Sequence, residues 1–97
     1  MDIVISKSSK PQKKFQAVID GRKTIHFGQA GASDFTKHND TERKQRYIDR
    51  HKKRENWQDP TTAGFFAKHV LWNKPTLTES IKDLDNRYKS LNIKYKK

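Results

Sequence analysis

Apolar residues fall on every second position in two short runs near the start of the chain. The first run is FQAVI, residues 15–19, and the second is IHF, residues 25–27. A period of two is typical of strands with one buried face. Asp20-Gly21 stands between the runs, and this pair favours a hairpin because glycine adopts the positive φ that tight turns require. The pattern predicts a β-hairpin over residues 14–28, and IVI at residues 3–5 leaves room for a further short strand.

The pattern becomes helical after residue 38. Three helix-start signals follow, each with a side chain that can accept a backbone N–H bond: Asn39 with Glu42, Asp59 before Pro60, and Thr76 with Glu79. Such caps predict helices over about 40–54, from Pro60 to about 72, and from Leu77 onward. The third helix carries apolar side chains at a spacing of three and four, which is the period of one helix face: Leu77, Ile81, Leu84, Tyr88 and Leu91.

These elements predict an α+β fold, a single small domain with an N-terminal hairpin, or three short strands, followed by three helices. Residues 1–13 are expected to hold the first strand and a basic loop, residues 14–91 the domain, and residues 92–97 a basic tail. The glycine-containing stretch after residue 27 lacks the Gly-Lys-Ser/Thr ending of a phosphate-binding loop. We therefore interpret it as a flexible connection from strand to helix.

The composition limits the size of the core and the kinds of cross-link and metal site that the chain can form. The chain has 97 residues, of which 31% are hydrophobic, and no cysteine, so the core is thin and neither disulfides nor thiolate zinc sites are available. No apolar run approaches the roughly 20 residues of a membrane-spanning helix. We expect an intracellular protein without membrane insertion that relies on a partner for part of its stability.

The net charge of +11 favours a polyanionic partner. Cations far outnumber anions in residues 37–54, and the arginines at 43, 46, 50 and 54 follow helical spacing. Arginine grips phosphate or carboxylate bidentately, which favours a binding role for this row over a merely solvated face. The predicted polyanion- or partner-binding residues are Arg43, Arg46, Arg50, Lys52, Lys53, Arg54 and Trp57.

Aromatic residues between 57 and 72 have two possible roles. They could stack on bases, but Phe66 shares a helical face with Val70, so most of them fit a core better. Trp57 precedes the expected second helix, and the sequence leaves open whether it is buried or contacts a partner.

Catalytic motifs are lacking. The four histidines lie apart without a close His-x-x-x-His pair, so a zinc site would need distant parts of the chain. Asp34, His38 and Asp40 could form a nuclease-like group, although Asp40 fits a helix start. We predict a protein that is not an enzyme, with no cofactor, no metal and no small-molecule substrate.

The chain also resembles small, basic, uncharacterised proteins of nucleocytoplasmic large DNA viruses, such as chloroviruses and mimivirus relatives. The matching pieces are IHFGQAGASDFTKHND, RYIDRHKKRENWQDPTTAGF, LWNKPTL and SI, within residues 25–81. The resemblance implies a virion protein that passes through the host cytoplasm or nucleus. On that basis the expected function is a minor capsid or cement protein whose arginine-rich helix contacts acidic capsid proteins. A nucleic-acid-binding protein of genome packaging or condensation is the alternative.

Overall fold

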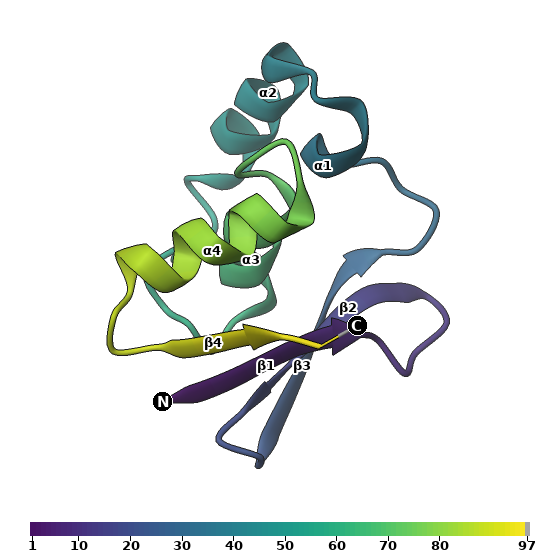
Figure 1. The fold of residues 1–97 in the computed structure, drawn as a ribbon. Coiled ribbons are helices and arrows are strands. Elements are labelled where there is room, and N and C mark those ends of the chain that lie inside the picture. Colours follow the sequence, from purple (N-terminus) through teal and green to yellow (C-terminus); the bar gives the residue numbers. More distant parts are fainter. Residues whose placement is uncertain (97) are drawn as a thin grey trace.

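The computed structural model describes residues 1–96 and shows a four-stranded mixed sheet (Figure 1). The strands are β1 (Asp2–Lys7), β2 (Lys13–Ile19), β3 (Lys23–Gln29) and β4 (Asn92–Tyr95), arranged in the order β3-β2-β1-β4. The pairs β1–β2 and β2–β3 are antiparallel, whereas β4 runs parallel to β1. The hairpin expected over residues 14–28 is confirmed as β2 and β3, and Asp20 and Gly21 both have positive φ at its turn.

The predicted fold class is wrong. The first strand is a central strand, and the helices lie between β3 and β4 instead of closing the chain. Parallel pairing requires a long crossover, and the helical segment supplies it. Part of the segment interpreted as a basic tail forms β4, because Ile93 is buried and Tyr95 packs against the core. Lys94 and Lys96 alternate with these residues, so the segment resembles a charged tail in the sequence, and Lys97 lies outside the described residues.

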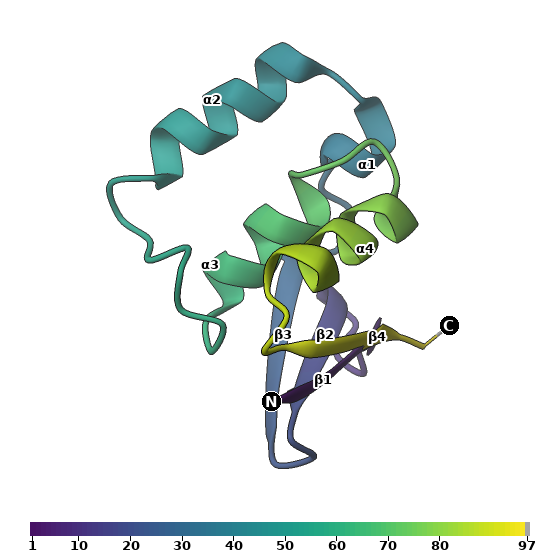
Figure 2. The same cartoon turned by 60° about the vertical axis from the view of Figure 1, so that its left-hand side comes forward.

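The helices form two layers on one face of the sheet (Figure 2). The inner layer holds α3 (Ala63–Phe66), which continues as a π-helical turn, η1 (Ala67–Leu71), and α4 (Leu77–Arg87). The outer layer holds α2 (Thr41–His51), which follows the single turn of α1 (Phe35–His38). Thus α2 lies farther from the sheet than α3 and α4 do.

The core fills the space between the sheet and the inner helices. Phe27 of β3 and Phe66 of α3 stack there with ring centroids 5.5 Å apart. Burial of these apolar side chains is the main stabilising contribution in a domain of this size. The other buried members of the cluster are Ile3, Ile5, Ala17, Ile19, Ile25, Phe65, Val70, Leu71, Ile81, Leu84, Leu91 and Ile93.

Two of the predicted helix starts are wrong. Asp40, not Asn39, accepts the first backbone N–H bonds of α2, while Asn39 ends α1 in the left-handed region at φ 52°. Asp59 accepts from the backbone and hydroxyl of Thr61, so this local turn delays the second helix until Ala63.

The third start is confirmed, because the Thr76 side chain accepts from the Glu79 backbone N–H at 3.1 Å. None of the helices within residues 1–96 is both long and apolar enough to cross a membrane.

Candidate functional site

The exposed side of α2 carries a shallow cleft lined by arginines. Arg43, Arg46 and Arg50 border it together with Asp49 and the ring of Trp72, around a volume of about 460 Å³. Their spacing of three and four residues places the guanidinium groups on one face of the helix. Tyr47 is the buried residue of α2 and stacks on Trp72, so the helix is fixed beside the cleft while the arginines remain exposed. We call this feature the arginine cleft.

The three arginines of the arginine cleft are free of acidic partners. Within residues 1–96, no carboxylate oxygen lies within 4.0 Å of their side-chain nitrogens. Asp49 is the acid at the cleft, and it accepts a hydrogen bond from Gln45 Nε2 at 3.0 Å. Three positive charges around one cleft, against the single negative charge of Asp49, favour an anion that can approach all of them.

Trp72 forms a wall of the arginine cleft, and its ring already has two aromatic neighbours. Its ring lies parallel to that of Tyr47, 4.5 Å away with an interplanar angle of 4°. The His38 ring lies 5.4 Å from it at 55°. Tyr47 thus occupies one face of the Trp72 ring, and the arginines make the cleft better suited to contacts with charged groups.

A second cleft adjoins the first and shares Arg50 and Trp72 in its wall. This central cleft has a volume of about 440 Å³ and lies between the end of α2, the end of β3 and α3. Two glycines allow its walls to approach closely. A Cβ at Gly64 would lie 2.8 Å from Cδ of Glu55, and a Cβ at Gly28, where φ is +78°, would lie 2.8 Å from Cδ1 of Leu71.

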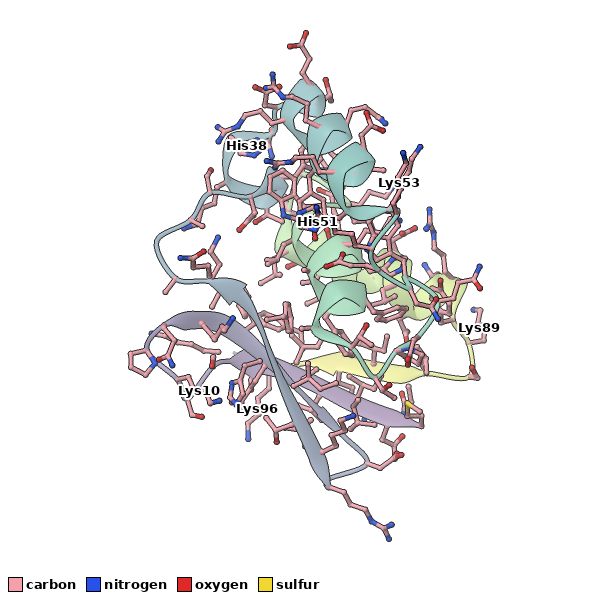
Figure 3. The ribbon with its side chains drawn as sticks, turned by 180° about the vertical axis from the view of Figure 1, so that it is seen from behind. Lys10, His38, His51, Lys53, Lys89 and Lys96 are labelled. Atoms are coloured by element: carbon pink, nitrogen blue, oxygen red, sulfur yellow. The ribbon has the colours of Figure 1, made fainter. Side chains whose placement is uncertain are left out.

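The central cleft brings together a histidine and a glutamate. His51 Nδ1 lies 3.5 Å from Glu55 Oε1, and the other oxygen of Glu55 accepts from Trp57 Nε1 at 2.9 Å. The His51 ring stacks on Tyr47 at 4.3 Å, and Figure 3 shows His51 between α2 and α3. Burial raises the pKa of the Tyr47 hydroxyl well above its usual range, so this group stays protonated. This pair was not predicted from the sequence, where the available signal was a His and a Glu four residues apart.

A buried ion pair borders the same cleft. Lys14 Nζ donates to Asp34, and Asp34 also accepts from the backbone N–H of Thr36 at 2.9 Å and from its hydroxyl group. These bonds cap α1 and neutralise the buried carboxylate. Asp34 thus has its hydrogen-bonding partners within the protein.

The remaining residues predicted to bind a partner are not part of the arginine cleft. Because α2 ends at His51, Lys52, Lys53 and Arg54 lie in the following turn, where all three are exposed. Arg54 lines a separate depression with Glu55 and Asn56. The structure therefore groups three of the four arginines of the predicted row.

Trp57 is held within the protein rather than projecting from it. It is half-buried, and its carbonyl oxygen accepts from His69 Nε2 at 3.1 Å. Lys68 Nζ lies 5.1 Å from the centroid of its ring. These contacts, with the bond to Glu55, tie the loop after α2 to η1.

The nuclease-like grouping of Asp34, His38 and Asp40 is explained by helix capping. Asp34 caps α1, Asp40 caps α2, and the Asp40 backbone N–H donates to His38 Nδ1 at 2.9 Å. In the part of the chain that the structure describes, no three His, Cys, Asp or Glu side chains are grouped so that they could hold a metal ion.

A family model described as a family of unknown function, DUF5754, matches residues 3–51. The chain belongs to this family. The DUF5754 match begins in β1 and ends with α2, so it includes the three arginines of the arginine cleft and His51. No curated protein and no solved structure is significantly similar to the chain.

Proposed function

We propose that this protein binds nucleic acid through the phosphate backbone, using the arginine cleft. The observation that carries the proposal is the grouping of Arg43, Arg46 and Arg50 around one open cleft without acidic partners. Arginine guanidinium groups match phosphate oxygens bidentately and remain charged at any physiological pH. The net charge of +11 adds long-range attraction for the same ligand.

The length of the row fits a nucleic-acid strand. Arg43 and Arg50 are seven residues apart, or about 10 Å along a helix that rises 1.5 Å per residue. One strand of a DNA duplex presents roughly three phosphates over that distance. Because the ring of Trp72 is already stacked on Tyr47, we expect contacts mainly to phosphates, and therefore affinity that depends on salt more than on sequence.

The experiment compares two variants that each lose three positive charges. The cleft variant is Arg43→Gln, Arg46→Gln and Arg50→Gln. The control is Arg22→Gln, Lys82→Gln and Lys89→Gln, three exposed positions in the β2–β3 turn, on α4 and in the turn after α4. Affinity for a fluorescent DNA duplex is measured by anisotropy between about 50 and 200 mM salt, the range over which phosphate contacts weaken strongly. The cleft variant should lose most of its affinity and the control little. Equal losses would show that net charge, not the cleft, is responsible.

A second candidate is an acidic protein surface in a virus particle, which the resemblance to viral proteins implies. It is favoured by the outer position of α2, because the exposed arginines of this helix could also bind carboxylates bidentately. Depletion of the cleft variant from purified particles, with unchanged DNA affinity, would support this candidate over nucleic acid. The absence of enzymatic activity and the virion location remain predictions, tested by nuclease assays with divalent metals and by mass spectrometry of fractionated particles.

A further inference from the structure

The inner helices leave one end of the sheet uncovered. At the end where β1 finishes and β2 begins, the rings of Phe15 and Tyr95 are only partly buried. They border a pocket of about 630 Å³ between the β1–β2 loop, the connection from β3 to α1, and α1 itself. The C-terminal end of the described chain reaches the same end of the sheet, and Lys10 and Lys96 lie there as well (Figures 1 and 3). We call this feature the end pocket.

The wall of the end pocket has an apolar part with two aromatic rings. Phe15 and Tyr95 meet edge to face with centroids 6.5 Å apart, and Phe15 continues into the core by stacking on Phe27 at 6.0 Å. Pro11, Ala30 and Gly31 complete this part of the wall. A volume of this size lies in the range of pockets for small molecules, roughly 300 to 1,000 Å³.

The rest of the wall is positively charged. Lys7, Lys13 and Lys37 come from three different elements and are exposed. In residues 1–96 none of them has a carboxylate within 4.0 Å. The acid of the pocket, Asp34, is already neutralised by Lys14, so it does not cancel their charge.

We propose that the end pocket binds a nucleotide, with its flat base against Phe15 and Tyr95 and its phosphate among the three lysines. A phosphate monoester carries between about −1.5 and −2 charges at pH 7, which suits three ammonium groups better than the single charge of a fatty carboxylate does. A base next to a phosphate monoester is present both in a free nucleotide and at the phosphorylated end of a strand. The inference is independent of the arginine cleft, and it adds a small-molecule ligand to a protein for which no small-molecule substrate and no cofactor were expected.

The test is an NMR titration of the ¹⁵N-labelled protein with deoxyadenosine monophosphate. We expect amide shifts at Lys7, Phe15, Gly31, Lys37 and Tyr95, which border the pocket, and affinity at least tenfold higher than for adenosine or tripolyphosphate alone. Equal affinity for tripolyphosphate, tighter binding of decanoate, or shifts confined to α2 would overturn the proposal.

Variants separate this pocket from general charge. Lys7→Gln with Lys37→Gln should weaken nucleotide binding at least fivefold, while the control pair Lys23→Gln with Lys82→Gln should leave it unchanged. The cleft variant should also retain nucleotide binding, so failure of one site does not imply failure of the other. Equal weakening by both lysine pairs would overturn the assignment.

Two short oligonucleotides identify the source of the ligand. Tighter binding of a 5′-phosphorylated hexamer than of the mononucleotide would assign the pocket to strand ends, and the reverse would assign it to free nucleotides. Both assignments would be overturned if the hexamer bound equally with and without its 5′-phosphate and the mononucleotide did not bind.

Discussion

The inner helices and the outer helix of this protein are attached to the sheet in different ways. The segment α3–η1 and α4 contribute Phe65, Phe66, Leu84 and several other fully or nearly fully buried side chains to the core. In contrast, α2 buries Tyr47 and is held by the stack of Tyr47 on Trp72 and by the bond from Lys44 Nζ to the Asn73 carbonyl oxygen at 2.7 Å. The inner helices therefore provide most of the stability, while the outer helix carries charged side chains that have no acidic partner. Substitutions in the two layers should therefore have different consequences.

The largest effect is expected in the inner layer. Leu84 is fully buried on α4, so Leu84→Ala should lower the free energy of unfolding by roughly 2 to 4 kcal/mol through lost burial and the resulting cavity. Urea unfolding measures the free energy of unfolding of this variant and of the control Leu77→Ala, a half-buried position on the same helix. A Leu84→Ala midpoint equal to that of the unmodified protein would contradict the assignment of α4 to the core.

Acid should also destabilise the inner layer through His69. Burial lowers the pKa of His69 to about 4, because its ring is packed against Phe65 and Tyr88 and its Nδ1 is buried without a partner. The unfolded chain, with a pKa near 6.5, binds the proton first, so stability is lost as the pH falls from about 6.5 to 4. The loss from this group is about 3 kcal/mol at most.

Unfolding measured across that pH window checks the contribution of His69. A His69→Leu variant removes the titrating group, so its stability should fall less between pH 6.5 and 4. The same pH dependence in both proteins would show that His69 is not the responsible group.

A smaller effect is expected at the start of α4. Thr76→Ala removes the hydroxyl that accepts from the Glu79 backbone, and it should cost about 1 kcal/mol. Thr78→Ala is the matched control, because Thr78 lies within the same helix and is exposed. Thermal unfolding of the two variants should separate them, and equal stability would show that the cap contributes nothing.

The smallest effect on stability is expected in the outer layer. Replacing Arg43, Arg46 and Arg50 with glutamine should change the free energy of unfolding by no more than about 0.5 kcal/mol, since surface positions rarely exceed that and glutamine is as good a helix former as arginine. Circular dichroism during urea unfolding measures the change. A loss as large as that of Leu84→Ala would show that the arginines hold α2 in place and would remove the distinction between the two layers.

Local signals in the sequence were sufficient for the hairpin, the cap at Thr76 and the exposure of Arg43, Arg46 and Arg50. These features depend on neighbouring residues, which a sequence shows directly. The place of β4 beside β1 was missed because it depends on a contact between the two ends of the chain, Asp2 with Asn92 among others. A short strand among lysines gives no local sign of such a partner.

The same holds for the sites: features set by neighbouring residues were predicted, and features set by contacts between distant residues were not. Helical spacing predicted the arginine row, but only the end of α2 at His51 separates Arg54 from it. The central cleft and the end pocket join residues from segments that are distant in sequence, such as Lys7, Lys37 and Tyr95. Trp57 remained undecided in the sequence because its partners, His69 and Lys68, come from η1.

The salt dependence of duplex DNA binding tests the central claim most directly. Each phosphate contact contributes about 0.9 to the slope of log affinity against log salt concentration. The cleft variant should therefore bind with a slope shallower by up to about 3 units, whereas the control with Arg22, Lys82 and Lys89 replaced should keep nearly the slope of the unmodified protein. Identical slopes for the two variants, in proteins that both remain folded, would contradict a phosphate-binding role for the arginine cleft.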